Sequence, residues 1–206
     1  QKTTLLELCY KTADTQCVLP DIFTLDEWLL NLVPFEINFS SAMSRLLIYK
    51  TLKLPTLESY WFSSIRSTAG FYNHFIQFYR LYREHQATPT HHPFFNSKRK
   101  QNELHQFISA FETLKQTHHL SDIYDTYDYV AQHPELLTTA LTPYNSLFLF
   151  GFDQIKPYQQ QLLHPLIMHP ISSSFLVHFD TENPCYERAE TTFSWLMSIE
   201  LPNKTV

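Results

Sequence analysis

Residues 145–163 read NSLFLFGFDQIKPYQQQLL, and this stretch decides the fold that the sequence predicts. The apolar run 147–150 is typical of a short buried strand, and residues 151–156 predict a turn. Pro157 is typical of the first position of a helix, because its fixed backbone angle suits a helix start and its missing N–H would have no partner there. A strand, a short polar loop and an amphipathic helix are therefore expected in this order.

A second strand-like run, 174–179, follows this helix and leads to Asp180. Two short apolar runs separated by a helix of suitable length predict a parallel pair of strands, because parallel strands need a crossover connection. We expect residues 147–150 and 175–177 to be neighbouring parallel strands, with a right-handed crossover through a helix at 157–168.

Helical periodicity covers nearly all the rest of the chain, so the expected fold class is α/β and helix-dominated. Thr24 followed by Glu27 predicts a capping box at the start of one helix. Ser40 or Ser41 is expected to open the next helix. Further helices are expected at 3–11, 57–67, 70–86, 100–117, 121–132, 135–141 and 186–199.

The order of strand, loop and Gln-bearing helix resembles the Walker B region of superfamily 1 DNA helicases. In that region the strand ends in an Asp-Glu pair, where Asp holds the water shell of magnesium and Glu activates the attacking water. Phe150 and Gly151 occupy these two positions here, and neither residue binds a metal or moves a proton. Asp153 and Gln154 lie where an active helicase keeps Gln and Asp, and Gln159 matches a glutamine of the next helix. These three polar residues are expected to fix the strand-to-helix turn and to cap the helix.

A helicase core in which Asp-Glu has become Phe-Gly is similar to the AddB/RexB type of inactivated superfamily 1 helicase. Residues 19–29, LPDIFTLDEWL, follow the family pattern lP-x-I-x-T-L-x-x-(F/W)-L, and residues 45–48, RLLI, match a helical R-x-L-L segment. The chain has no G-x-x-x-x-G-K-[ST] phosphate loop, and Gly70 and Gly151 are its only glycines. The nuclease pattern that this family often carries at its C-terminus is also absent from these 206 residues.

The resemblance implies a partial RecA-like parallel sheet that carries a large all-helical insertion subdomain. Residues 1–39 are then the N-terminal part of the helicase-like domain, and residues 40–144 form the insertion. Residues 145–206 supply the degenerate Walker-B strand, the crossover helix, and the strand and helix that follow. The chain is expected to be a fragment of a longer protein that binds no cofactor and no metal.

The chain has 206 residues, 44% of them hydrophobic and 16% aromatic, which is sufficient for a folded core. Its apolar runs are far shorter than the roughly 18 residues of a membrane span, and no signal-peptide pattern opens it. Cys9, Cys17 and Cys185 are an odd number without C-x-x-C spacing, which favours buried thiols of a cytosolic protein over a disulfide framework or a zinc site. A cytoplasmic location without membrane contact is therefore expected.

The net charge of −5 conceals a segregation of charge along the chain. Residues 1–44 carry two bases and six acids, and residues 101–206 carry four bases and twelve acids. Residues 45–100 carry nine bases and two acids, a net charge of +7. A basic middle between acidic ends is typical of a local nucleic-acid surface in an otherwise acidic protein.

The basic middle interleaves cations with aromatic rings, as single-stranded DNA binders do when cations contact phosphates and rings stack on bases. The candidate DNA-binding residues are Arg80, Arg83, Lys98, Arg99 and Lys100. Each ring has an alternative place in the core of a helical subdomain, and the cations could form a solvated surface without a ligand. The aromatic candidates of the same segment include Tyr60, Trp61, Phe62, Tyr72, Tyr79, Phe94 and Phe95.

Asp122, Asp125 and Asp128 recur every three residues on one helix face, a spacing that could hold magnesium. Apolar side chains at the alternating positions favour an amphipathic helix instead, with these aspartates on its solvent-exposed side. Two His-His pairs, at 91–92 and 118–119, lack a third acidic ligand at helical spacing. Loop and helix-end positions, not metal binding, are expected for these histidines.

The combined interpretation is a non-catalytic fragment of an inactivated helicase of the AddB/RexB type. The resemblance implies a bacterial parent protein of DNA repair and recombination, which processes double-strand breaks together with a motor or nuclease partner subunit. The fragment would contribute weak binding of single-stranded or double-stranded DNA, or contact with that partner. Two alternatives stay open: a protein-protein scaffold module without DNA contact, and a fragment of an active superfamily 1 helicase whose Walker A lies upstream of Gln1.

Overall fold

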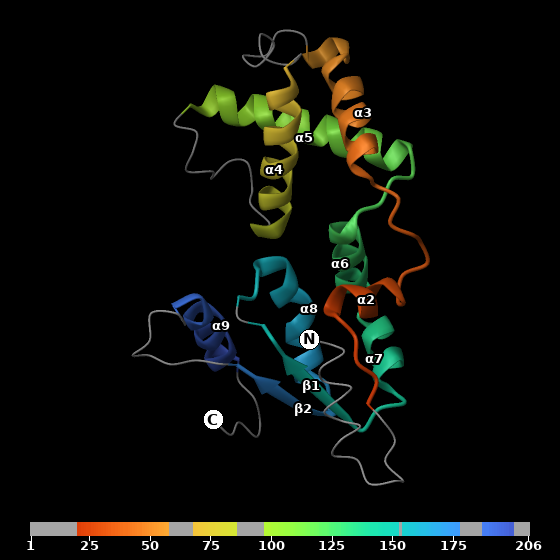
Figure 1. Ribbon diagram of the computed structural model, residues 1–206, viewed down its shortest axis with the longest axis vertical. Coiled ribbons are helices and arrows are strands. Elements are labelled where there is room, and N and C mark those ends of the chain that lie inside the picture. Colours follow the sequence, from red (N-terminus) through yellow and green to blue (C-terminus); the bar gives the residue numbers. More distant parts are fainter. Residues whose placement is uncertain (1–19, 58–67, 86–96, 153, 178–186, 200–206) are drawn as a thin grey trace.

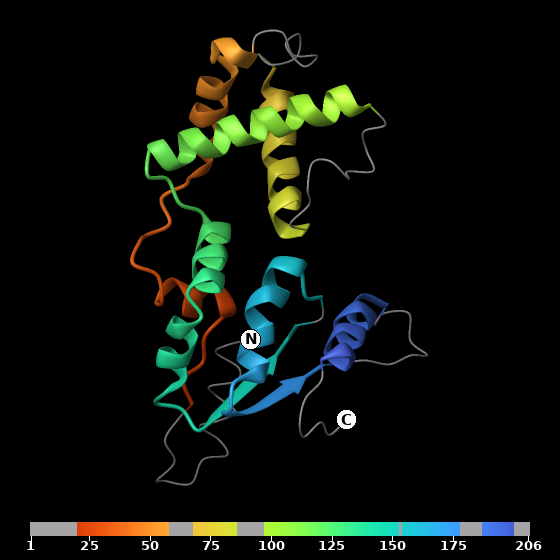
Figure 2. The same ribbon diagram turned by 180° about the vertical axis from the view of Figure 1, so that it is seen from behind.

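The computed structural model describes residues 20–57, 68–85, 97–152, 154–177 and 187–199. Figures 1 and 2 show two groups of elements that lie one above the other: crossing helices, and a small sheet flanked by helices. The helical elements within the described ranges are α2 (Leu25–Leu30), α3 (Ser41–Leu52), η1 (Pro55–Leu57), α4 (Ala69–His85), α5 (Lys98–Thr117), α6 (Ile123–Gln132), α7 (Glu135–Leu141), α8 (Pro157–Met168) and α9 (Glu187–Ser198).

The sheet consists of two parallel strands, β1 (Ser146–Phe150) and β2 (Ser172–Leu176), which are connected through α8. Leu149 of β1 lies opposite Phe175 of β2 in the register. The prediction of two neighbouring parallel strands with a crossover helix between them is confirmed, and so is a helix-dominated α/β fold. The expected helices at 3–11 and, apart from its first residue, at 57–67 lie outside the described residues.

Strand β2 covers Ser172–Leu176, so it begins before the apolar run that predicted it and ends before Val177, which was expected to belong to the strand. The serines at 172–174 lie opposite residues 146–148 of β1. Pairing of this kind uses backbone N–H and C=O groups, which every one of these residues supplies whatever the polarity of its side chain. The strand therefore extends into a polar stretch that hydrophobicity alone does not reveal.

Local signals at the starts of the helices are confirmed. Thr24 Oγ1 accepts from the backbone N–H of Glu27 (3.2 Å), and the Glu27 carboxylate accepts from the backbone N–H of Thr24 (2.9 Å). Ser40 is the N-cap of α3 and accepts from Met43 N–H (3.3 Å). Pro157 occupies the first turn of α8, as its sequence position predicts.

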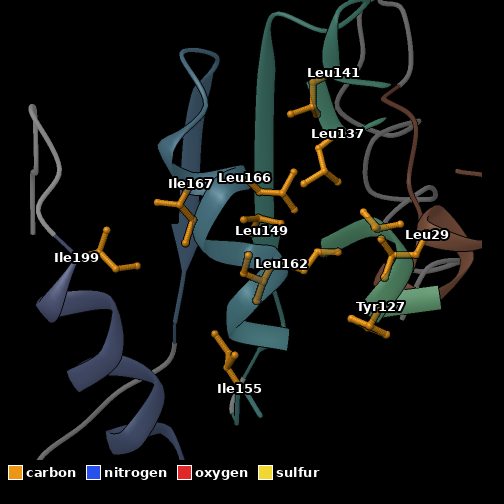
Figure 3. Packing of buried hydrophobic residues seen from close by; sticks show 12 residues of the cluster. Leu29, Tyr127, Leu137, Leu141, Leu149, Ile155, Leu162, Leu166, Ile167 and Ile199 are labelled. Carbon is orange, nitrogen blue, oxygen red and sulfur yellow. The ribbon is translucent and has the colours of Figure 1, made fainter. Parts of the chain in front are cut away.

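Buried side chains form two separate clusters, and the first is here named the sheet core (Figure 3). It joins the two strands to α2, α6, α7, α8 and the region of α9, so elements from both ends of the described chain meet in it. The sheet core consists of Leu29, Tyr127, Val130, Leu137, Leu141, Leu149, Ile155, Leu162, Leu163, Leu166, Ile167 and Ile199.

The second cluster, here named the helical core, lies between α3, α4, α5 and the short turn η1. Aromatic rings of α4 and α5 interlock in it; the rings of Phe75 and Phe107, for example, lie edge to face with centroids 4.8 Å apart. The buried residues of the helical core are Leu47, Ile48, Leu52, Leu57, Phe75, Tyr79, Phe107, Ile108 and Phe111.

The side chains of the helical core come from the single stretch 39–120, and the two ends of this stretch meet. The backbone N–H of Asn38 donates to the carbonyl of Ser121 (3.1 Å), and the Asn38 side chain accepts from Ser121 N–H (2.8 Å). Helices α6 and α7 also lie within the expected segment 40–144, but their buried side chains belong to the sheet core.

Candidate nucleic-acid interface

Arg80 and Arg83, two of the predicted DNA-binding residues, lie on α4 in different surroundings. Arg80 is exposed, whereas the side chain of Arg83 is only 12% exposed. Arg83 Nη1 donates to Glu112 of α5 (2.9 Å), and Arg83 Nη2 contacts Asp128 (2.8 Å) and Asp125 (3.3 Å) of α6. The guanidinium of Arg83, which the sequence predicted to contact DNA phosphates, is therefore bound by three carboxylates of the same chain.

Lys115 of α5 lies beside Arg83 and is almost fully buried, with a side chain 1% exposed. Its Nζ is 2.7 Å from Asp122 Oδ2 and 2.7 Å from Asp125 Oδ2, and it also donates to the Tyr79 hydroxyl (3.2 Å). The Tyr79 hydroxyl in turn donates to the carboxylate of Glu112. We name this connected set the ion network; its members are Tyr79, Arg83, Glu112, Lys115, Asp122, Asp125 and Asp128.

The interpretation of Asp122, Asp125 and Asp128 as the solvent-exposed side of a helix is wrong for the first two residues. Asp122 is buried, and besides its contact with Lys115 it caps α6 by accepting from the backbone N–H groups of Tyr124 and Asp125. These carboxylates bind cationic side chains. No group of three or more His, Cys, Asp or Glu residues within the described ranges is arranged to hold a metal ion.

Burial and crowding of charge shift the titration of several groups in the ion network. Burial raises the pKa of the Tyr79 hydroxyl, and the neighbouring carboxylates raise it further. Burial lowers the pKa of Arg83, but the surrounding acidic groups outweigh burial and raise it overall. Burial also raises the pKa of Asp128, against the opposing effect of Arg83. Arg83 is therefore charged, as arginine ordinarily is, and the surrounding acidic groups favour that charged form further.

The remaining predicted DNA-binding residues gather in the first turn of α5. Lys98, Arg99 and Lys100 are consecutive and exposed, and Arg99 also pairs with Glu103 one turn later (2.8 Å). Figure 1 shows this turn at the end of α5 that is remote from α6. The structure thus brings three of the five predicted cations together and leaves Arg83 in a different site.

Cations are unusual in the first turn of a helix, where the positive end of the helix dipole opposes them. Acidic residues are the preferred occupants of this position, and α5 has none in its first turn. Ser97, the N-cap residue, makes no hydrogen bond with its side chain to the backbone N–H groups of this turn. An anion placed here would be attracted by the three side chains and by the helix end together.

Of the aromatic residues named for base stacking, the structure describes Tyr72 and Tyr79, and both take part in the helical core. Tyr79 is buried in the helical core, and Tyr72 is half-buried and packs against it. Residues 60–62 and 94–95 lie outside the described residues. Tyr49 on α3 is an exposed ring, with Lys53 Nζ 5.4 Å from its centroid, and the sequence pattern did not single it out.

The residues that the resemblance aligned with the Walker-B motif lie where β1 passes into α8. Phe150 ends the strand with a partly exposed ring, and Gly151 follows with a φ of +79°, in the left-handed region that favours glycine. Gln154 is exposed, and Asp153 lies outside the described residues. Gln159 Oε1 accepts from the backbone N–H of Lys156 (3.0 Å), so its predicted role in capping the helix is confirmed.

The loop before α8 is tied to two other elements, and the sequence alone gives no sign of either contact. Lys156 Nζ pairs with Glu84 in the last turn of α4 (2.5 Å), and Glu84 also accepts from the Tyr124 hydroxyl of α6 (3.1 Å). The buried backbone N–H of Ile155 donates to Thr192 Oγ1 of α9 (2.9 Å). The loop before α8 is therefore linked by side-chain contacts to α4, a helix of the helical core, and to α9.

Lys115 is the central residue that sequence reasoning missed, although a signal for it exists. Phe107, Phe111 and Lys115 follow one another at four-residue spacing, so a lysine occupies the third position of an apolar stripe that faces the core. A lysine in such a position must find carboxylate partners, because burial of an unpaired charge is very costly. Aspartates at helical spacing a few residues later are the obvious candidates.

Within the described residues, no helix is both long enough and apolar enough to cross a membrane. Comparison of the chain with known protein families, with curated proteins and with solved structures finds no match.

Proposed function

We propose that this chain is a non-catalytic part of an inactivated, RecA-like helicase domain, and that it binds single-stranded DNA weakly through the first turn of α5. The parent protein would act in bacterial double-strand-break repair, with a motor or nuclease partner subunit. The observation that carries the DNA proposal is the row of three exposed cations at the positive end of a helix. Cations in the first turn destabilise a helix, because they oppose its dipole, but they attract an anionic ligand to the same place.

The RecA-like part of the proposal rests on the parallel strand pair and on its incomplete cover. Phe148 is 72% exposed and Leu176 is 62% exposed, on the face of the sheet that also carries Phe150. Parallel sheets are normally covered on both faces and extended at their edges. Additional strands and helices of a larger domain would supply this cover. Residues 39–120, whose ends meet at Asn38 and Ser121, would be the helical insertion of that domain.

The absence of catalysis is proposed from the chemistry of the residues that end β1. Phe150 has no ligand atom in its side chain, and Gly151 has no side chain. Hydrolysis of a nucleoside triphosphate needs a group that positions magnesium and a group that orients water. The end of β1 supplies neither, so binding is the function that this chain supports best.

Arg83 does not belong to the proposed DNA-binding set, because the ion network neutralises it. The proposed set is Lys98, Arg99 and Lys100 in the first turn of α5, all of which are exposed, and Arg80 is a further exposed cation on α4. This set offers about three phosphate contacts, so the logarithm of the affinity for single-stranded DNA should fall with the logarithm of salt concentration at a slope of about −2.

The test is the affinity of a fluorescent oligo-dT for the protein of residues 1–206, measured by anisotropy over a range of salt concentrations. Lys98→Glu/Lys100→Glu should abolish most of the binding at low salt and flatten the salt dependence. The matched control is Lys50→Glu/Lys53→Glu, which makes the same change of charge on α3 and should bind almost as the wild type does. Equal losses in the two double variants would show a response to net charge alone and would disprove the site.

A further inference from the structure

A shallow pocket lies between α3 and the C-terminal turn of α5, at the opposite end of α5 from Lys98. The pocket has a volume of about 130 Å³. Four apolar side chains form its floor, and Lys50 and His118 form its rim. The apolar floor consists of Met43, Leu46, Leu47 and Leu120.

The turn that carries His118 is held rigidly. His118 ends α5, His119 adopts a left-handed φ of 52°, and Leu120 N–H closes the turn on the carbonyl of Lys115 (2.9 Å). A residue with a side chain rarely adopts this backbone conformation, which carries strain. Asn38 fixes the strained turn, because its side-chain Nδ2 donates to the carbonyl of His119 (2.9 Å). The pocket therefore has a preformed rim.

The rim presents two nitrogen groups to the same place. Lys50 Nζ and His118 Nε2 are 3.2 Å apart, both side chains are exposed, and none of the described residues that line the pocket is acidic. Leu46 of the pocket lining is 49% exposed, and Tyr49, its neighbour on α3, is 50% exposed, so the apolar surface extends toward solvent. A positively charged rim next to an uncovered apolar floor is complementary to a segment that carries a carboxylate beside an aliphatic side chain.

We infer that this groove binds an acidic peptide segment of a partner protein, with one aliphatic side chain in the pocket and a neighbouring carboxylate on Lys50 and His118. An amphipathic helix with Leu and Glu one turn apart has this arrangement. The apolar floor favours a peptide over nucleic acid, because a DNA backbone has no aliphatic group to place there. Peptide binding here goes beyond the proposed DNA contact: α5 has 20 residues, so its two ends are about 30 Å apart.

The test uses three fluorescein-labelled helical peptides of 14 residues and the protein of residues 1–206. The first peptide carries Leu and Glu one turn apart, the second replaces Leu by Ala, and the third replaces Glu by Lys. Wild-type protein should bind the first peptide more tightly than the other two in anisotropy titrations. Lys50→Glu should weaken binding of the first peptide about fivefold or more and should strengthen binding of the third, because the sign of the rim is reversed.

Two further variants distinguish binding in the groove from a general response to charge. Leu46→Ala, at an exposed position that tolerates change, should weaken binding of the first peptide and leave its charge dependence intact. Lys98→Glu removes the same charge at the other end of α5 and should leave peptide binding unchanged, while it lowers DNA binding if the proposed function is correct.

Three outcomes would overturn the inference. The first is equal affinity of the wild type for all three peptides, or no binding up to about millimolar concentration. The second is displacement of the peptide by oligo-dT with the same dependence on Lys50, which would make the groove a nucleic-acid surface. The third is a lower melting temperature of Lys50→Glu with unchanged peptide affinity, which would assign Lys50 and His118 to stabilisation of the α5 terminus alone.

Discussion

The helical core and the sheet core differ in the groups that they bury: charged side chains are buried beside the first, and apolar side chains are left exposed beside the second. At one end of the helical core, the ion network buries Lys115 and Asp122. The sheet core buries aliphatic side chains but exposes Phe148 and Leu176 on the other face of its strands. The ion network of the helical part therefore encloses charge, whereas the strands of the sheet part leave one apolar face uncovered.

The difference shows that charge segregated along a sequence can cancel in space. Arg83 comes from the basic stretch 45–100, and its three partners come from the acidic stretch that follows. Glu84 of the basic stretch likewise pairs with Lys156 of the acidic stretch, so here the acid and the base come from the opposite stretches. The net charge of a stretch therefore overstates the positive surface that it presents, because partly buried pairs of this kind neutralise part of it.

The largest effect is expected when the ion network loses its buried cation. Lys115→Met keeps an unbranched side chain but leaves Asp122 and Asp125 without their common partner, which should lower the free energy of unfolding by about 3–5 kcal/mol. The measurement is urea denaturation followed by circular dichroism. Lys98→Met is the matched control and should change stability by less than about 0.5 kcal/mol. Similar stability of the two variants would mean that the ion network contributes no more than a surface charge does.

Of the fold, the sequence predicts the strand pair, the crossover helix and most helix boundaries, because periodicity and capping residues act locally. It does not predict the start of β2, where serines pair through their backbone. The candidate site is harder to predict, since Arg80 and Arg83 are two arginines of the same predicted helix and their sequence context does not distinguish them. Only the packing of α4 against α5 and α6 decides that Arg83 is enclosed and that Arg80 is exposed.

A smaller effect should separate the two faces of β1. Leu149→Ala, on the covered face, should lower the free energy of unfolding by about 2–4 kcal/mol, because it leaves a cavity against α8. Phe148→Ala, on the uncovered face, should cost less than about 0.5 kcal/mol and should reduce self-association. Denaturation midpoints and light scattering measure the two effects. A large loss of stability in Phe148→Ala would show that its face of the sheet is covered in solution.

The smallest effect concerns tyrosines where the two cores meet. Burial, followed by the nearby carboxylates Asp26 and Glu84, raises the pKa of Tyr158 to about 12. The unfolded chain releases this proton near its ordinary value of 10, so the stabilisation is complete below pH 10 and is lost as the pH rises toward 12. With its partial exposure taken into account, Tyr158 should contribute a loss of up to about 1 kcal/mol at pH 11.

Tyr158→Phe removes this titration and serves as the comparison variant for the measurement. Urea midpoints at pH 9, 10 and 11 should fall less steeply in the variant than in the wild type. Absorbance at 295 nm reports tyrosine ionisation directly. Parallel curves for the two proteins would show that Tyr158 titrates normally and is accessible to solvent in the folded state.

The contact between Asn38 and Ser121 has a consequence for the order of folding. The Tyr127 hydroxyl donates to Asp26 across 101 positions of the chain, so direct assembly of the sheet core must close a very long loop. When the helical core forms first, residues 38 and 121 already touch, and the remaining loop shrinks to roughly twenty residues. A folded helical core therefore lowers the entropic cost of bringing α2 to α6. We expect the helical core to form first and to bring α2 close to α6, and the sheet core to form second.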